Sequence, residues 1–335
     1  MSNISTDLPS KITTDIDFDK PGVQHGALTM PYSHNLSPWG SILMPVSVFA
    51  GGTGPTVLLV GGNHGDEYEG PIACMKLIRE LDIDKLTGRV IVIPALNYPA
   101  VKNGTRLSPI DGKNMNRAFP GDRAGTVTDM IADYVQRFIL PLCDAVADIH
   151  AGGRMMSFLP TSVIHRLADA RHMDRTLEAA KAFNAPNCLV LEELDPQGML
   201  DTAVEELGTL FISTELGGGG SMSVETVRIA YDGMRNLLVH MGVLSEPLRK
   251  NGDTRFLETP DGAFVTAEQD GILEFAAELG QKVSAGEAIA YIHDIDRPMA
   301  APAVYRAPLD GIVMHRHVAG LIGRGDCLSV IAVEI

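Results

Sequence analysis

The stretch TVLLVGGNHGDEYEG, residues 56–70, joins an apolar run to a glycine loop that carries a histidine beside acidic residues. The run TVLLV (56–60) is bounded by Pro55 and Gly61, which is typical of a short buried strand. The loop itself has two interpretations. It is either a tight strand-to-helix turn with solvated polar side chains, or a binding site held by His64 and Glu67.

The sequence around this stretch alternates between strand and helix patterns. Apolar runs bounded by turn residues predict strands at 43–50, 56–60, 89–96, 143–150, 187–191 and 209–214. Apolar residues at three- and four-residue steps predict helices at 71–81, 126–142, 169–183 and 221–241. Such alternation predicts a three-layer α/β domain with a mostly parallel, mixed sheet.

Composition excludes several classes of protein. The 335 residues carry a net charge of −15 and no basic cluster, which argues against binding of nucleic acid. No apolar run approaches the length of a membrane span. The four cysteines are far apart, form no CxxC pair, and follow no secretory leader, so we expect a cytoplasmic protein with reduced thiols.

The chain is expected to have three parts. Residues 1–40 are polar and weakly patterned, which predicts an N-terminal arm or edge hairpin. Residues 41–246 contain the α/β pattern, and residues 247–335 change to short strands separated by glycines. An extended arm would suit exchange between the subunits of a homo-oligomer.

The C-terminal part contains an internal repeat. Segments 270–292 and 310–332 both open with Asp-Gly-Ile and carry two later glycines before an apolar strand. This pattern predicts the two halves of a barrel-sandwich hybrid, the fold of biotinyl and lipoyl carriers. Those carriers need a lysine on an exposed hairpin, and the connecting segment 293–308 has none. The repeat therefore predicts an all-β domain that covers the main site.

His64 and Glu67 lie three residues apart, so both side chains can face one point if the loop turns into a helix. His150 ends a later predicted strand, and ligand sites gather at the carboxyl ends of parallel strands. Imidazole and carboxylate groups suit zinc, and a catalytic zinc site needs a third protein ligand. One HxxE pair alone is more often a polar turn, but a second histidine at an equivalent strand end, His150, favours a metal site. A neighbouring divalent ion could be held by the same groups.

Glu215 follows another predicted strand, in STELGGGG (213–220). The glycines suggest that the main chain passes close to a ligand. Glu215 is either a helix N-terminal acid favoured by the dipole or, beside a metal, a carboxylate that moves protons.

The segment GTRLSPIDGKNMNRAFPGD, residues 104–122, is a long loop between a predicted strand and a predicted helix. Loops of this length within α/β domains are more often functional than idle. The loop holds Arg106, Asn114, Asn116 and Arg117. Arginines can polarise a carbonyl or bind a substrate carboxylate, although surface arginines in loops are usually only solvated.

These motifs together resemble the succinylglutamate desuccinylase/aspartoacylase family of zinc amidohydrolases, which is related to the zinc carboxypeptidases. The likeness covers roughly residues 40–335, including the C-terminal domain, which in aspartoacylases narrows the entrance to the site. It implies one zinc ion with three ligands: His64, Glu67 and His150. It also implies a general base and then acid in Glu215, oxyanion stabilisation by Arg106, and substrate carboxylate binding by Asn116 and Arg117. The stretch between Arg106 and Asn116 is longer than in aspartoacylase itself.

Within that family, segments 152–165 and 192–206 look most like the branch that deacetylates Nα-acetyl-L-2,4-diaminobutyrate in ectoine catabolism. Such a substrate carries an ammonium group, for which we expect an acidic partner: Glu192, Glu193 or Asp195. A solvated acidic turn is the other interpretation of these three residues. Alternatives for the whole chain are a deacylase or desuccinylase of another N-acyl amino acid, a carboxypeptidase-like hydrolase, and a non-catalytic binding protein.

Overall fold

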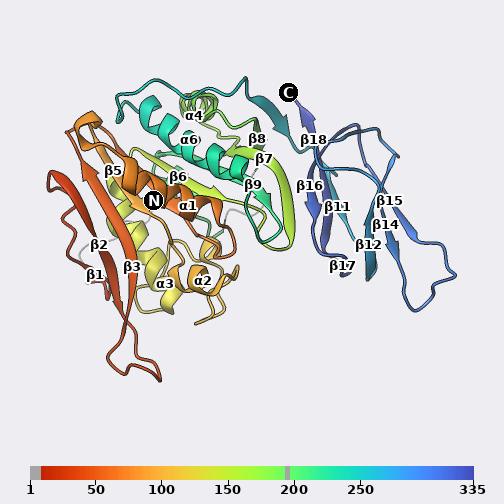
Figure 1. The fold of residues 1–335 in the computed structure, drawn as a ribbon, viewed down its shortest axis with the longest axis horizontal. Helices are drawn as coiled ribbons and strands as arrows, with labels where there is room; N and C mark the ends of the chain where they lie inside the picture. The colour runs from red at the N-terminus through yellow and green to blue at the C-terminus, as the bar shows by residue number, and fades with distance from the viewer. Residues whose placement is uncertain (1–8, 193–196) are drawn as a thin grey trace.

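The computed structural model describes residues 9–192 and 197–335, and in these residues one long sheet runs through both lobes of the molecule (Figure 1). The larger lobe contains the sheet's first nine strands. In spatial order they are β1 (Thr13–Thr14), β2 (Gly22–Pro31), β3 (Ser41–Ala50), β5 (Arg89–Ile93), β4 (Thr56–Gly61), β6 (Ala145–His150), β9 (Leu210–Gly218), β7 (Met156–His165) and β8 (Asn187–Leu191).

The centre of this sheet is parallel and buried. β4 pairs with β5 on one side and with β6 on the other, and β6 pairs in turn with β9. Val57 and Leu59 of β4 pack into one apolar cluster, whereas Leu58 and Val60 pack into a second cluster on the opposite face. A strand covered on both faces has a continuous apolar sequence, as TVLLV does. The carboxyl ends of β4, β6 and β9 consequently lie at one edge of the sheet.

Helices cover both faces of the parallel centre, as Figure 1 shows. One layer contains α1 (Glu69–Glu80), α4 (Ala170–Phe183) and α6 (Val224–His240), and the other contains α2 (Tyr98–Asn103), α3 (Val127–Tyr134) and α5 (Leu200–Glu205). Within the described ranges, no helix combines the length and the apolar character that crossing a membrane requires. The mixed α/β fold predicted from the sequence is confirmed.

Most predicted segments correspond to observed elements. The strands expected at 43–50, 56–60, 143–150, 187–191 and 209–214 are β3, β4, β6, β8 and β9, and the helices expected at 71–81, 169–183 and 221–241 are α1, α4 and α6. The strand expected at 89–96 ends at Ile93, before Pro94. The helix expected at 126–142 is α3 followed by a π-helical turn (Val135–Ile139) and a short 3-10 helix (Leu140–Leu142).

The prediction of a mostly parallel sheet is wrong for the sheet as a whole. Its parallel pairs are β4–β5, β4–β6, β6–β9, β7–β8 and β8–β10, and its other pairs are antiparallel. The N-terminal hairpin is one reason, because all ten residues of β2 pair with β3 in antiparallel register. A second reason is β7, which no sequence pattern predicted. It contains Pro160, which weakens a strand prediction, and it runs antiparallel to β9.

The C-terminal strands form two sheets. β10 (Arg255–Glu258), β11 (Phe264–Thr266), β13 (Lys282–Val283), β16 (Gly311–His317) and β18 (Cys327–Glu334) continue the long sheet, whereas β12 (Gly271–Phe275), β14 (Ala288–His293), β15 (Ala303–Arg306) and β17 (Leu321–Ile322) form a separate one. The two predicted repeats correspond to β12–β13–β14 and β16–β17–β18. The short strand of each repeat pairs with the first strand of the other, since β13 pairs with β16 and β17 with β12.

The C-terminal strands also close a ring with the larger lobe. β10 lies parallel to β8, with Leu257 opposite Leu189, and β16 lies antiparallel to β7, with His315 opposite Phe158. The pairs β7–β8, β8–β10, β10–β18, β18–β16 and β16–β7 therefore form a closed circuit of five strands. The C-terminal part is joined to the α/β part by backbone hydrogen bonds and is more than an appendage on a linker.

Candidate functional site

The loop after β4 carries the first two predicted ligands. Gly62 adopts φ +67°, a left-handed conformation that glycine accepts readily, and the chain reverses there toward α1. A Cβ atom on Gly65 would lie 2.0 Å from the carbonyl carbon of Ala100, so only glycine fits at this position. The loop is therefore packed against α2, and it holds His64 and Glu67 as buried side chains.

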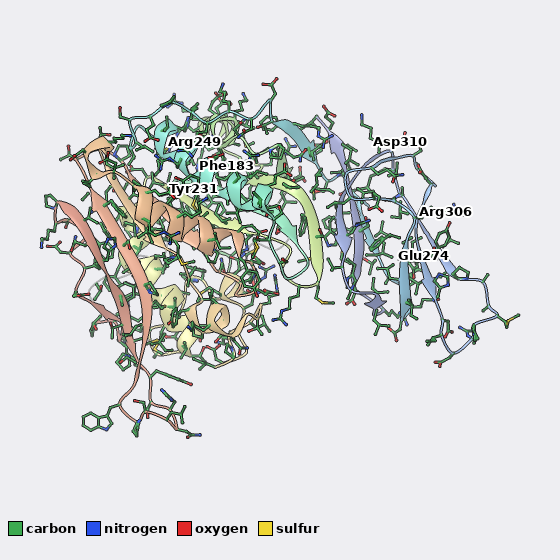
Figure 2. The ribbon with its side chains drawn as sticks, in the orientation of Figure 1. Phe183, Tyr231, Arg249, Glu274, Arg306 and Asp310 are labelled. Atoms are coloured by element: carbon green, nitrogen blue, oxygen red, sulfur yellow. The ribbon has the colours of Figure 1, made fainter. Side chains whose placement is uncertain are left out.

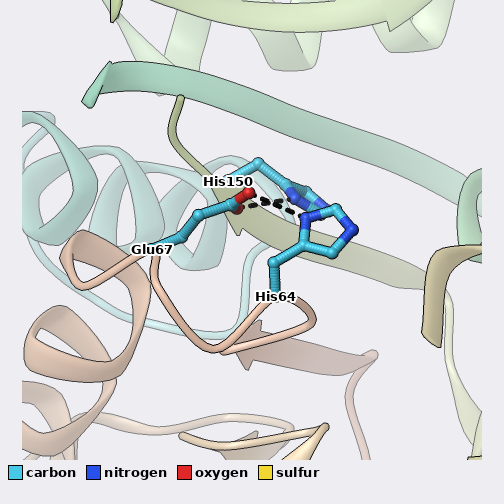
Figure 3. A group of neighbouring side chains, drawn as sticks. All are labelled: His64, Glu67 and His150. Atoms are coloured by element: carbon cyan, nitrogen blue, oxygen red, sulfur yellow. Dashed lines mark hydrogen bonds and ion pairs between the residues drawn. The ribbon is translucent and has the colours of Figure 1, made fainter. Parts of the chain in front are cut away.

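His150, the last residue of β6, completes a three-residue group (Figure 3). The two Glu67 carboxylate oxygens lie 2.7 Å from Nδ1 of His64 and 2.9 Å from Nδ1 of His150. One possible ligand atom from each residue lies within 4.8 Å of the other two, and all three residues are buried. The structure thus brings together the three residues that the sequence predicted as metal ligands.

The outer nitrogens of both imidazoles have oxygen partners. Nε2 of His64 lies 3.0 Å from Oδ1 of Asn114, which also accepts from the backbone N–H of Asn116 and is therefore an oxygen. Nε2 of His150 lies 2.9 Å from Oδ2 of Asp148. If both Nε2 atoms donate to these acceptors, the Nδ1 lone pairs face the Glu67 carboxylate, which has no proton to offer. The Arg106 guanidinium reaches two of these acceptors, and a bound metal ion is a further cation that the arrangement would suit.

The acids around His150 also favour a positive charge at this place, which without a metal ion falls on the imidazole itself. Burial disfavours the imidazolium, but Asp148 and Glu67 outweigh it and raise the pKa of His150 well above its ordinary value. Burial also opposes ionisation of Glu67, yet His150 and His64 hold the pKa of this carboxyl far below its usual range. Two histidines and a carboxylate with outer partners on the imidazoles are a donor set that fits zinc. The residues present therefore fit the metal that the family resemblance implies.

Glu215 lies beside this group, because β9 pairs with β6 and places Glu215 opposite His150. Burial, together with the negative charge of Glu67, raises the pKa of Glu215 to about 8. Its Oε2 atom is buried and has no hydrogen-bond partner among the described residues. A carboxyl group in this setting can both accept and release a proton near neutral pH.

Arg106 lies at the edge of the same group. Its Nη1 atom is 3.3 Å from Nδ1 of His64 and 3.5 Å from Oε1 of Glu67. The side chain is 45% exposed and lines the cavity. Its guanidinium therefore lies between the cavity and the three predicted metal ligands His64, Glu67 and His150, which we call the metal-ligand group. A cation at this point is available to a developing negative charge on a bound carbonyl oxygen.

Asn116 and Arg117 belong to a 3-10 turn, Met115–Arg117, that begins with Asn114 as its cap. Oδ1 of Asn116 accepts a hydrogen bond from the backbone N–H of Leu200 at 3.0 Å. The amide nitrogen of Asn116 and the guanidinium of Arg117 are thus the groups of this turn that a carboxylate ligand could use. Both residues line the cavity described next.

A cavity of about 410 Å³ joins these residues. Arg106, Asn116, Arg117 and Glu215 line it together with His64 and His150. Its wall also includes side chains that the sequence did not single out as site residues: Met156, Phe158, Leu189, Met199, Asp201 and Met314. His165 lines it as well.

The three acids expected to bind an ammonium group are placed differently. Glu192 does not line the cavity. Its side chain is 78% exposed and lies 3.4 Å from Nε of Arg166, where water weakens the ion pair. Glu193 and Asp195 lie outside the described residues. The structure therefore does not bring Glu192 to the site.

Asp148 is a site residue that the sequence analysis missed. It accepts from His150 Nε2 and, at 2.7 Å, from the side-chain amide of Asn63. A signal was present, because residues two apart on a strand point to the same face. In DIH (148–150), the acid lies on the same face as the predicted metal ligand His150 and is placed to orient its imidazole.

Comparisons with known proteins agree with this geometry. The model of the succinylglutamate desuccinylase/aspartoacylase catalytic domain matches residues 53–241. The N-alpha-acetyl-L-2,4-diaminobutyric acid deacetylase of Halomonas elongata is 44% identical over 326 residues, which cover 97% of this chain and 95% of that protein.

Solved structures give the same result for the whole chain. The product-bound ectoine utilization protein EutE (DoeB) from Ruegeria pomeroyi superposes with a TM-score of 0.94 at 45% identity, covering 97% of this chain and 100% of that one. A succinylglutamate desuccinylase from Silicibacter sp. TM1040 superposes with a TM-score of 0.94 at 43% identity, covering 98% and 100%. The resemblance inferred from the motifs is confirmed, and the chain belongs to the succinylglutamate desuccinylase/aspartoacylase family.

Proposed function

We propose that this protein is a zinc-dependent deacetylase that hydrolyses Nα-acetyl-L-2,4-diaminobutyrate to acetate and 2,4-diaminobutyrate. The observation that carries the chemistry is the convergence of His64, Glu67, His150 and Glu215 on one cavity. The substrate assignment is supported by the 44% identity to the Halomonas elongata deacetylase over 97% of the chain.

His64, Glu67 and His150 would hold the zinc ion, with Asn114 and Asp148 orienting the two imidazoles. A zinc ion held there would lower the pKa of a coordinated water and polarise the acyl carbonyl. The hydrogen bonds at Nε2 would keep each imidazole ring turned so that its Nδ1 lone pair faces the zinc position. Removal of a partner would let the ring rotate or change its tautomer.

Glu215 would take the proton from the attacking water and deliver it to the leaving nitrogen. Burial and the charge of Glu67 raise the pKa of Glu215, and this favours the double role. A carboxyl group whose pKa lies near the working pH both gains and loses a proton readily. The amide nitrogen must be protonated before it departs as an amine. Glu215 is the carboxyl of the cavity wall that stands directly opposite His150, and its Oε2 atom is buried.

Arg106 would stabilise the negative charge that develops on the carbonyl oxygen. Asn116 and Arg117 would bind the α-carboxylate of the substrate, and the planar guanidinium suits a carboxylate well. This division of roles places the scissile amide between the metal-ligand group and the Met115–Arg117 turn.

The C-terminal strands support a small substrate. Thr259, Phe264, Met314, Cys327 and Val330 contribute to the cavity wall, so the C-terminal part covers the cavity from that side. A long peptide would meet this wall, which disfavours the carboxypeptidase-like alternative. The free cysteines, three of them buried, suit the reducing cytoplasm that we expect.

The test is acetate release from Nα-acetyl-L-2,4-diaminobutyrate by the purified protein, before and after treatment with a chelator and after zinc is restored. We expect activity that the chelator removes and zinc restores. A parallel panel of succinylated amino acids and C-terminal peptides distinguishes the alternatives. Faster turnover of a succinyl or peptide substrate would assign the enzyme to one of those activities instead.

A further inference from the structure

The proposed substrate carries a positive charge at the end of a short side chain, and that charge needs a polar or anionic partner where it is taken into the cavity. Among the described residues that line the cavity, the carboxylates are those of Asp201 and Glu215. Glu215 faces His150 and is the expected proton carrier. A permanent ion pair would hold Glu215 in its ionised form and would oppose its release of a proton. Asp201 has no such conflict.

Asp201 is a buried residue in the first turn of α5. Its Oδ1 atom accepts from the backbone N–H of Thr202 at 2.6 Å, which fixes the side-chain rotamer. Its Oδ2 atom lies 3.9 Å from Nε2 of His165, which also lines the cavity. One carboxylate oxygen is thus used by the helix terminus, and the other lies on the His165 side.

His165 is held in place by a second acid of the same helix. Its Nδ1 atom lies 2.9 Å from Oε2 of Glu205. Asp201 and Glu205 are four residues apart on α5 and therefore lie on one helix face. The imidazole lies against this face between the two carboxylates. Two acids and one histidine leave this part of the wall with a negative charge even if His165 is protonated.

The first turn of α5 is also fixed to the turn that carries Arg117. Leu200 N–H donates to Oδ1 of Asn116 at 3.0 Å, and Phe119 N–H donates to the carbonyl of Gly198 at 3.0 Å. A Cβ atom on Gly198 would lie 2.6 Å from the carbonyl oxygen of Arg117, so the two segments are in close contact. Asp201 therefore occupies a defined position next to Asn116 and Arg117. An anionic side chain, that of Asp201, and a cationic one, that of Arg117, therefore line the same cavity.

We propose that Asp201 binds the side-chain ammonium of the substrate while Asn116 and Arg117 bind its α-carboxylate. His165 and Glu205 act as positioning residues that hold the Asp201 carboxylate against the cavity. This inference rests on the proposed function, since it names the residue that recognises the amino group of diaminobutyrate. It makes Asp201 the determinant that separates a diamino acid from a neutral amino acid of the same shape.

A neutral substrate of the same shape isolates this contact. Nα-acetyl-L-norvaline has a methyl group where Nα-acetyl-L-2,4-diaminobutyrate has its ammonium, and the two are otherwise alike. A site that pairs a buried polar group with its substrate rejects the analogue that lacks the group, so we expect the wild type to prefer the charged substrate by about 100-fold or more in kcat/KM.

The experiment compares zinc-loaded wild type, Asp201→Asn and Glu206→Gln on both substrates. Asp201→Asn retains an oxygen for the Thr202 N–H but loses the charge, and Glu206→Gln removes an exposed charge just after α5. We expect Asp201→Asn to lower kcat/KM for the charged substrate by about 100-fold and to leave that for the norvaline analogue unchanged. Glu206→Gln should behave as the wild type. Thermal unfolding of each variant reports on folding, and Asp201→Ser replaces Asp201→Asn if the latter does not fold.

The outcomes distinguish failure of the Asp201 assignment from failure of the proposed function. If the wild type prefers the charged substrate and Asp201→Asn keeps that preference, or loses both activities equally, Asp201 is not the ammonium partner. If the wild type hydrolyses neither substrate, the proposed function has failed, and the assignment of Asp201 fails with it. Loss of preference in Asp201→Asn alone supports the proposal.

Discussion

Asp148 accepts a hydrogen bond from Nε2 of His150 at 2.9 Å, on the side of the imidazole opposite the Glu67 carboxylate. The two residues are two positions apart on β6, so the strand itself sets this contact. The hydrogen bond selects the tautomer whose Nδ1 lone pair faces the metal-ligand group. Asp148 would therefore act on a bound metal ion through the histidine.

Asp148→Asn should weaken zinc binding by about 10- to 100-fold, the usual effect of removing a partner of a metal-binding histidine. The amide can present its NH₂ group to Nε2 and thereby favour the wrong tautomer. The zinc dissociation constant, measured by competition with a chromogenic chelator, checks this expectation. The exposed Glu206→Gln is the control, and equal affinities in the two variants would contradict the role of Asp148.

Glu215→Gln should lower kcat by about 10²- to 10⁴-fold, because the amide cannot carry a proton between water and the leaving nitrogen. Its zinc content should match that of the wild type, since Glu215 is not one of the three ligand residues. Metal analysis and steady-state kinetics on the same preparation check both points. A variant that keeps full kcat would show that another group moves the proton.

Gly233→Ala should destabilise the contact between α4 and α6. A Cβ atom at position 233 would lie 2.3 Å from the ring of Phe183, the buried last residue of α4, which is labelled in Figure 2. Overpacking of this kind costs about 1–3 kcal/mol, more than the gain in helix propensity from glycine to alanine. Urea denaturation measures the free energy of unfolding. Val224→Ala, at a 91% exposed site of the same helix, should have little effect.

If the ring of Phe183 is the cause, Phe183→Leu should cost less in the Gly233→Ala background than in the wild type. A double-mutant cycle measures this coupling. Strictly additive free energies would show that the destabilisation arises elsewhere in α6.

Glu246 should contribute to stability in a manner that depends on pH. Hydrogen bonding to Arg235 is the main cause that lowers the pKa of Glu246, and Lys85 adds to it at 3.1 Å. A carboxyl group whose pKa is lower in the folded than in the unfolded protein stabilises the folded state at pH values above its unfolded-state pKa. This stabilisation is lost as the pH falls through the folded-state pKa. Glu246→Gln should therefore cost about 1 kcal/mol at pH 7. The difference from the wild type should shrink below about pH 4. A difference that does not change with pH would exclude this ion pair as its source.

Local sequence patterns predicted the parallel centre of the sheet well. TVLLV is apolar at every position because both faces of β4 are covered, and the edges of such a run are marked by Pro55 and Gly61. The glycine loop after it was also interpretable, since His64 and Glu67 are close along the chain. Histidine at the end of another strand was enough to suggest a third ligand.

Local sequence patterns did not predict the antiparallel strand β7. β7 carries Pro160 and mixed polarity, because its first half lies against the C-terminal strand β16 and only its second half is fully buried. Its pairing partners are distant in sequence, so no local pattern marks the strand. The closed ring of β7, β8, β10, β18 and β16 depends on those long-range pairs.

Local patterns and strand ends were enough to predict the parallel strands and to single out His64, Glu67, His150 and Glu215, and the motifs around these residues carried the family resemblance. Only the tertiary structure decided that Asp201 lines the cavity and that Glu192 lies on the surface. Both are acids of the segment 192–206. What separates them is the packing of α5 against the Met115–Arg117 turn, which buries one carboxylate beside the site and leaves the other in water.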